Sequence, residues 1–193
     1  RMGRPLFSAV PQTEQSEILE EVVRAAQRLS KNRVGALVVL ERENGLDDVV
    51  EGGVVVDAAV TREILAAIFQ PNSPLHDGAA LVQGGRLTQA RCVLPLTQRA
   101  GLPEGVGTRH RAAVGLTEET DAVVVVVSEE TGQIAVSCRG EIYPGLDPPQ
   151  LRDHLRDFMV AGPPPVEAAE PESESAETSE ESRPRAADAQ TTS

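Results

Sequence analysis

Five consecutive valines, at positions 123 to 127, most constrain how this chain can fold. Side chains branched at Cβ favour extended backbone, and a strand that is apolar on both faces has to be covered on both. The run over 122–128 therefore predicts a central strand of a sheet, and the apolar run over 34–41 predicts another buried strand. The segment 43–53, with its Asn-Gly and Gly-Gly pairs, is predicted to be a loop.

Apolar residues at helical spacing predict helices between the strands. The first has Thr13 as its N-cap, the second covers 61–69, and the last runs from an Asp147 cap to about Val160. A further helix is predicted to begin at Thr108, directly behind a glycine.

Glycine pairs and apolar runs also predict hairpins. Strands over 78–83 and 86–94 flank Gly84-Gly85, a two-residue connection favoured in hairpins, and a strand over 133–138 returns after Gly132. Hairpins give antiparallel pairs, whereas alternating helices and strands give parallel ones. We therefore expect an α/β fold: a single domain with a mixed, mostly central β-sheet flanked by helices on both faces.

The charge balance limits the partners. The chain has 30 acidic residues against 18 Lys and Arg, a net charge of −12, and it has no basic stripe, so no nucleic-acid partner is predicted. After Val160 there are eight acidic and two basic residues in a sequence rich in Pro, Glu and Ser. Such a composition predicts a disordered acidic tail over 161–193, after an N-terminal linker over 1–12 and a domain over 13–160.

Cysteine usage and hydropathy indicate a reducing compartment. Cys92 and Cys138 each fall in a predicted strand, where a lone cysteine is usually a small buried side chain, and zinc-ligand spacing is absent. No apolar stretch approaches the roughly 20 residues of a transmembrane helix. We expect a cytoplasmic protein; because the chain begins at Arg1 rather than Met, a membrane tether in a longer precursor stays open.

The segment Thr108-Arg109-His110-Arg111 predicts an anion site. The N-terminus of a helix offers unpaired N–H groups and a partial positive charge, and two guanidiniums with an imidazole add to both. A phosphate chain is the anion that fits best. About thirty residues upstream by direct count, His76-Asp77-Gly78-Ala79 supplies a carboxylate, and together the two clusters indicate nucleotide chemistry. Neither a P-loop nor a Gly-x-Gly-x-x-Gly motif is present.

Several of these residues allow a second interpretation. Asp77 in a turn can bond its own backbone, and His76 can hold its loop rather than a metal. His110, between two arginines, is expected to have a lowered pKa and to be neutral.

The acidic and basic side chains near the predicted helix start are also ambiguous. Arg109 and Arg111, two residues apart on a helix, point to opposite sides. One of them is therefore expected to pair with Glu118 or Glu119, or to act across a subunit interface. The adjacent acids at 129 and 130 are either solvated turn residues or the source of one metal ligand.

Four segments resemble the diadenylate cyclase domain, the enzyme module that makes cyclic di-AMP. They are Pro74–Ala79, Cys92–Leu96, Gly107–Ala113 and Val127–Gly132, in the family's order within residues 10–160. Asp-Gly-Ala and Arg-His-Arg are the two signature motifs of this family. Residues 33–37 are most similar to the membrane-linked subfamily, in which the domain follows transmembrane helices.

The resemblance implies roles for the residues of these motifs. One ATP would bind per protomer, and two protomers of a homodimer or higher oligomer would meet face to face. Asp77 would bind Mg²⁺ or Mn²⁺ and help activate the ribose 3′-hydroxyl. The catalytic Arg109, His110 and Arg111 would hold the phosphates, together with the nucleotide-binding residues Thr108 and Ser128.

The same resemblance extends to the base and the metal. Gly78 and Ala79 would line the nucleotide, with the backbone near Leu94 meeting the adenine. His76 and Glu130 would be further metal ligands. The resemblance also implies that relatives carry an aromatic ring near the base at the Val93 position, and its loss here would loosen adenine stacking.

Three functions are consistent with the sequence. The first is a diadenylate cyclase, a nucleotidyltransferase that condenses two ATP into cyclic di-AMP and releases two pyrophosphates. The second is a catalytically silent sensor that binds ATP or cyclic di-AMP. The third is a scaffold whose basic helix start docks an acidic partner. Asp77 together with Thr108–Arg111 favours the cyclase over the sensor. The scaffold explains Arg109 and Arg111 but leaves the Asp-Gly-Ala loop without a purpose.

Overall fold

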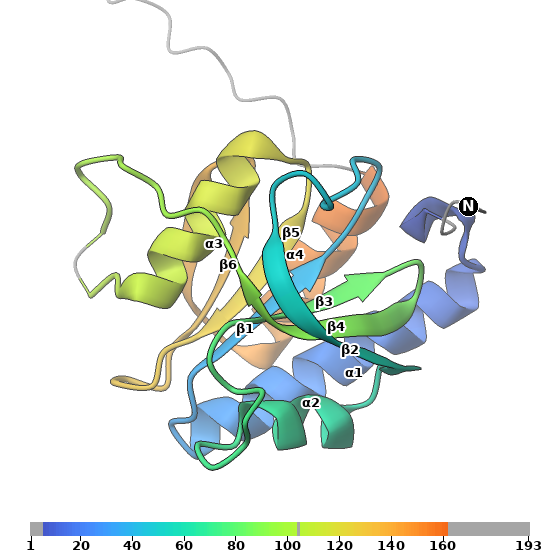
Figure 1. The fold of residues 1–193 in the computed structure, drawn as a ribbon, viewed down its shortest axis with the longest axis horizontal. Helices are drawn as coiled ribbons and strands as arrows, with labels where there is room; N and C mark the ends of the chain where they lie inside the picture. The colour runs from blue at the N-terminus through green and yellow to red at the C-terminus, as the bar shows by residue number, and fades with distance from the viewer. Residues whose placement is uncertain (1–5, 104, 162–193) are drawn as a thin grey trace, which may run out of the picture. The chain divides into compact units, whose positions relative to one another are not determined.

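A seven-stranded mixed sheet forms the centre of the computed structural model, which describes residues 6–103 and 105–161 (Figure 1). Its strand order is β2-β4-β3-β1-β5-β6-β7. The strands are β1 (Ala36–Leu40), β2 (Glu51–Ala59), β3 (Ala79–Gln83), β4 (Arg86–Val93), β5 (Val123–Val127), β6 (Ile134–Cys138) and β7 (Glu141–Leu146). β1 and β3 are parallel, and the other neighbouring strands are antiparallel. The mixed sheet expected from the sequence is confirmed.

Helices cover both faces of this sheet. They are α1 (Gln12–Lys31), α2 (Arg62–Phe69), α3 (Thr108–Glu119) and α4 (Pro148–Arg156), with shorter turns at η1 (Phe7–Ala9) and η2 (Asp157–Ala161). One buried cluster joins α1, α2 and α4 to the sheet, and a second cluster joins α3 to the other face. Within the described ranges, no helix combines the length and the apolar surface needed to cross a bilayer.

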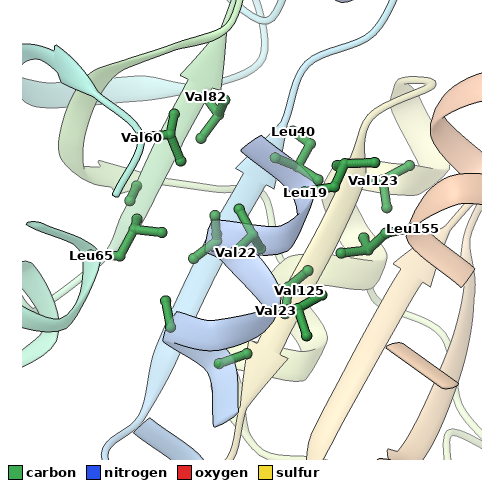
Figure 2. Packing of buried hydrophobic residues seen from close by; sticks show 14 of the residues in the cluster. Leu19, Val22, Val23, Leu40, Val60, Leu65, Val82, Val123, Val125 and Leu155 are labelled. Carbon is green, nitrogen blue, oxygen red and sulfur yellow. The ribbon is translucent and has the colours of Figure 1, made fainter. Parts of the chain in front are cut away.

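The valine run is the central strand β5, between β1 and β6, and its alternation divides the core. Val123 and Val125 belong to the cluster under α1, and Val124 and Val126 to the cluster under α3. In Figure 2, Val123 and Val125 lie among side chains of α1 and α4. Because successive side chains of a strand point to opposite faces, an unbroken apolar run needs helices on both sides.

The predicted helix caps are correct except for the first. Asp147 accepts a hydrogen bond from the Gln150 N–H at 2.8 Å, as a capping residue does. The prediction that Thr13 caps the first helix is wrong, because α1 begins at Gln12 behind Pro11. Pro11 has no N–H to satisfy and no side chain that could cap the helix, and the first-turn residues Gln12, Thr13 and Glu14 are exposed, so water can bond their N–H groups.

Two strands at the edges of the sheet were not predicted. β2 begins inside the segment expected to be a loop, and β7 contains Pro144 and Gly145. Gly52 and Gly53 in β2 have positive φ values of 67° and 106°. An edge strand is bonded on one side only, so it tolerates proline, glycine and exposed side chains, and its sequence lacks a buried pattern.

The ends of the domain bear on the predicted boundaries. Phe7 and Val10 are buried in the main cluster although they precede Thr13. The linker over 1–12 and the tail over 161–193 stay predictions, because residues 1–5 and 162–193 lie outside the described residues.

Both cysteines are buried and free, and burial raises the pKa of the Cys92 thiol to about 11.

Helix α3 is held close to the segment that follows β4. A Cβ placed on Gly115 would lie 2.7 Å from the Thr97 backbone nitrogen and still closer to the Pro95 carbonyl oxygen. The Thr97 N–H donates to the Arg111 carbonyl at 3.1 Å, and the Thr97 hydroxyl donates to Glu118 at 2.8 Å. These contacts fix the helix whose first turn carries Arg109.

We predict that Gly115→Ala destabilises the domain by about 1–3 kcal/mol, because the added methyl group overlaps the backbone of 95–97. The expected fall in melting temperature is about 2–4 °C per kcal/mol for a chain of this size. Gly45→Ala is the matched control, since a Cβ there meets nothing within 4 Å. Equal melting temperatures for the two variants would contradict the close approach of α3.

Candidate functional site

Four strand ends meet at one edge of the sheet. The parallel pair Val38–Ala80 places the start of β3 beside the start of β1. The antiparallel pair of Ala36 with Val127 places the end of β5 at the same edge, as does the pairing of Ala79 at the start of β3 with β4 near its end. The edge therefore gathers residues 35, 77–78, 93–94 and 128–130, which are far apart in the sequence.

The N-terminus of α3 lies over this edge. Arg109 Nη1 bonds to Glu129 Oε2 at 2.7 Å, which ties the first turn of α3 to the turn after β5. A Cβ placed on Gly35 would lie 2.5 Å from Arg109 Nη1, so the guanidinium rests against the residue that precedes β1. The parallel pairs of β1 and β3 begin at Val38 with Ala80, so Gly35 and Asp77 both lie three residues before the paired stretch, at the same edge of the sheet.

A pocket of about 180 Å³ opens between α3 and the turn after β5. Its lining combines the first turn of the helix with the end of the strand: Gly105, Gly107, Thr108, Arg109, His110, Val127, Ser128, Glu129 and Glu130. Pockets for whole organic ligands have volumes of about 300–1,000 Å³. This one has room for part of a nucleotide. The helix N–H groups and the Arg109 guanidinium suit phosphates, whereas Glu129, which pairs with Arg109, and Glu130 bring negative charge to the same lining.

His110 is buried, at 7% exposure, and its Nδ1 accepts a hydrogen bond from the Gly107 N–H at 3.2 Å. Burial is the main cause that lowers the pKa of His110, the charge of Arg109 lowers it further, and Glu130 opposes both. The predicted lowering is confirmed, but burial rather than the flanking arginines dominates it. A neutral ring whose Nδ1 accepts has its proton on Nε2, which makes Nε2 a hydrogen-bond donor.

Asp77 is exposed, and within the described residues its carboxylate has no hydrogen-bond partner. The alternative in which it bonds its own turn is therefore not what the structure has. Gly78 has a φ of 134°, and a Cβ there would lie 2.7 Å from the Cys92 carbonyl oxygen. The close approach that requires glycine is thus made by the backbone of β4, and it directs the chain so that Asp77 stays open to solvent.

His76 holds its own loop. Its Nδ1 lies 2.6 Å from the Ser73 carbonyl oxygen, and since a carbonyl can only accept, Nδ1 carries the proton. The Nε2 of a neutral ring then has the lone pair, which is the arrangement common in metal-binding histidines. The loop-holding role is present, and it leaves a metal-binding role open.

The structure brings together some of the predicted site residues and separates others. Thr108, Arg109, His110, Ser128 and Glu130 share the pocket. Asp77, Gly78, Ala79 and Leu94 lie along the same sheet edge outside its lining, and the Ala79 and Leu94 side chains are buried.

The partner of Arg109 differs from the one expected. The prediction named Glu118 or Glu119 for one arginine, but the partner is Glu129, because the start of α3 faces β5 whereas Glu118 bonds to Thr97. Arg111 is exposed and outside the pocket lining, so the two arginines do serve different sides of α3.

A ready-made metal cage is absent from the part of the chain that the structure describes, where no three His, Cys, Asp or Glu side chains converge. Mg²⁺ bound with a nucleotide typically takes one or two carboxylates, with phosphates and waters completing the shell. The exposed Asp77 carboxylate fits that smaller requirement.

Sequence reasoning missed Gly35. As one glycine before a strand it gives no signal, and the need for glycine comes from Arg109, which follows more than seventy residues later.

An open sheet edge with a cationic helix start is an arrangement of α/β domains that suits anionic ligands. The family model described as DisA bacterial checkpoint controller nucleotide-binding matches residues 23–142, so the chain belongs to that family. The chain is 39% identical over 155 residues to the cyclic di-AMP synthase CdaA of Bacillus subtilis, covering 80% of this chain and 55% of CdaA. It thus spans about half the length of that relative.

Two further relatives are covered more fully. The diadenylate cyclase of Mycoplasma pneumoniae is 33% identical over 160 residues, which are 82% of this chain and 79% of the relative. The crystal structure of a double mutant of DacA from Staphylococcus aureus has a TM-score of 0.73 at 38% identity, covering 77% of this chain and 99% of DacA.

We predict that the wild-type chain loses stability relative to His110→Asn as the pH falls below about 6.5. Because the pKa of folded His110 is lowered, the unfolded chain takes up the proton first. The contribution of the neutral ring is complete above the unfolded pKa and is lost as the pH falls through the folded one.

Asparagine is the matched variant, because its Oδ1 can accept from the Gly107 N–H and does not titrate. Urea unfolding at several pH values between about 5 and 8 gives the free energy of unfolding of both chains. Their difference should shrink toward acid. Parallel curves would show that His110 titrates as it does in water.

Proposed function

We propose that this chain is a diadenylate cyclase, which condenses two ATP into 3′,5′-linked cyclic di-AMP and releases two pyrophosphates. The observation that carries the proposal is the shared sheet edge, where an exposed Asp77 precedes β3 and the pocket of Arg109 and His110 opens beside the end of β5. The names of the relatives, cyclic di-AMP synthase and diadenylate cyclase, support it. The site supplies a group for each requirement of nucleotidyl transfer.

The pocket at α3 is assigned to the phosphates. Arg109 and the Nε2–H of His110 donate charge-assisted hydrogen bonds to phosphate oxygens, and the Thr108 and Ser128 hydroxyls line the same space. Negative charge grows on the leaving pyrophosphate as its bond to the α-phosphorus breaks. Donors that are already oriented stabilise that charge without further reorganisation.

Asp77 is assigned to the ribose. Its carboxylate accepts a hydrogen bond from the 3′-hydroxyl and promotes loss of the proton as the oxygen attacks phosphorus. It would also be the first ligand of a divalent cation, Mg²⁺ or Mn²⁺. His76 Nε2 and Glu130 do not converge with it among the described residues, so they would have to move toward the cation to act as further ligands. When bound, such a cation neutralises phosphate charge. Gly78, Ala79 and the backbone near Leu94 line the sugar and the adenine.

Two protomers are needed for the product. Each 3′-oxygen attacks the α-phosphorus of the other nucleotide, so two ATP molecules related by a twofold axis complete the ring. A monomer should therefore bind ATP without forming cyclic di-AMP. The exposed Arg111, on the side of α3 away from the pocket, is assigned to the partner protomer or its nucleotide across this interface.

The runner-up is a silent sensor that binds ATP or cyclic di-AMP. It explains the phosphate pocket equally well, but it gives no reason for an exposed and unpartnered Asp77. The cyclase and the sensor therefore differ in the effect of changing Asp77.

The purified chain, incubated with ATP and Mg²⁺ or Mn²⁺, should produce cyclic di-AMP and pyrophosphate, separated by chromatography. Asp77→Asn keeps the size of the side chain and removes its charge, and we expect product to fall by about 100-fold or more. Asp47→Asn, in the loop before β2, is the control for loss of a carboxylate. Chelation of the metal should abolish product in every variant.

The outcomes separate the functions. If the chain binds ATP but makes no product at any protein concentration, the result supports the silent sensor. If it binds no nucleotide at all, the result supports a scaffold that docks an acidic partner. For the cyclase, the rate per protomer should rise with protein concentration, because the active form is a dimer.

We also predict that Val93→Tyr lowers the KM for ATP by about fivefold or more, because a ring stacks on adenine better than an isopropyl group. Val93 is 61% exposed at the end of β4, so a larger side chain has room there. Val55→Tyr, at 77% exposure within β2, is the matched control. Equal KM values for Val93→Tyr and wild type would place the base elsewhere.

A further inference from the structure

Gly35 lies directly against the Arg109 guanidinium. A Cβ on Gly35 would lie 2.5 Å from Arg109 Nη1, 2.7 Å from Arg109 Cζ and 3.0 Å from Glu129 Oε2. Non-bonded heavy atoms need about 3.5–4.0 Å, so even alanine would displace the ion pair. Gly35 has none of the positive φ values that would explain a glycine by its backbone alone. A side chain at position 35 would meet the ends of two side chains that can shift, so its expected effect is to move the guanidinium rather than to unfold the domain.

Glu129 uses only one edge of the guanidinium. The hydrogen bond joins Arg109 Nη1 to Glu129 Oε2, and within the described residues the Nε–Nη2 edge has no partner. A guanidinium has five donors in a rigid plane, so an anchor on one edge leaves a fork that can bind a phosphate with two bonds.

The Arg109 side chain is more buried than the Glu129 side chain that anchors it. The Arg109 side chain is 25% exposed, whereas Glu129 is 61% exposed. An isolated surface ion pair contributes little to stability, so this pair acts mainly on geometry. It fixes a long side chain, which would otherwise sample many rotamers, before the nucleotide arrives.

We propose that Gly35 and Glu129 are positioning residues that lock Arg109 across the start of β1 and leave its free edge for the phosphates of the nucleotide. The proposal rests on the proposed function and extends it to two residues that act through Arg109. Gly35 supplies the space and Glu129 the anchor. Glu129 stays paired with Arg109 when the nucleotide binds, because the two ligands use different edges.

The first test compares two glycines. Gly35→Ala should raise the KM for ATP and lower kcat, for a combined loss on the order of 100-fold in kcat/KM, because the guanidinium is displaced by an ångström or more. Gly45→Ala is the matched control, since its Cβ meets nothing within 4 Å. Both variants should keep the wild-type melting temperature to within a few degrees. Equal kinetics for the two variants would overturn the proposal.

The second test asks whether the effects pass through Arg109. In an Arg109→Ala background, Gly35→Ala should have no further effect on the KM for ATP, because the clash is gone. Glu129→Ala should likewise have no further effect in the Arg109→Ala background. In the otherwise wild-type chain, Glu129→Ala should lower kcat/KM about tenfold. Losses that multiply in the double variants would show that these residues act independently of Arg109.

A third variant tests whether Glu129 acts through its hydrogen bond to Arg109 or through its negative charge. Glu129→Gln keeps an oxygen that accepts from Nη1, so it should retain most of the activity that Glu129→Ala loses. If Glu129 were instead a metal ligand, both substitutions would fail alike and added Mn²⁺ would partly restore them. That pattern would also overturn the proposal.

The proposed function can fail separately. A wild-type chain that makes no cyclic di-AMP would refute the cyclase, and calorimetric titration with ATP would then test the positioning of Arg109 alone. In that assay Gly35→Ala should weaken ATP binding about tenfold and Gly45→Ala should not. Equal binding by both variants would reject the positioning role whatever the enzyme makes.

Discussion

The site depends on the two different pairings of β1. Its parallel pairing with β3 brings Asp77 to the edge where β1 begins, and its antiparallel pairing with β5 brings the turn of Glu129 to the same edge. A sheet with only one kind of pairing would place one of these segments at the far edge. In this domain the mixed sheet is therefore what brings the segment before β3 and the turn after β5 to one edge.

The sequence predicted the buried part of this arrangement well. The valine run and the apolar run over 34–41 became β5 and β1, because an apolar strand has to be buried. The edge strands β2 and β7 were not predicted, since they are largely exposed and interrupted by glycine or proline. A periodic pattern of apolar residues indicates which side chains are buried. These two edge strands are held by backbone hydrogen bonds to one neighbouring strand, which leave no such pattern in the sequence.

The same distinction holds in the site. Arg109, His110 and Asp77 could be proposed from the sequence because charged groups at a helix start and in a Gly turn indicate chemistry by themselves. Gly35 and the partner of Arg109 were not found, since their roles exist only after β1, β5 and α3 have packed together. A glycine that leaves space for a distant side chain gives no local pattern, so sequence reasoning on one chain cannot separate it from a turn residue.

The openness of the site fits a reaction that joins two nucleotides. The pocket of about 180 Å³ has room for phosphates, while Asp77 and Val93 lie exposed along the edge beside it. Nucleotidyl transfer to water would compete at such an edge unless something covers it. In the proposed cyclase the cover is the second protomer with its own ATP, so closing the site and supplying the second substrate are one event. A site already closed in the monomer would have no route for the incoming 3′-oxygen.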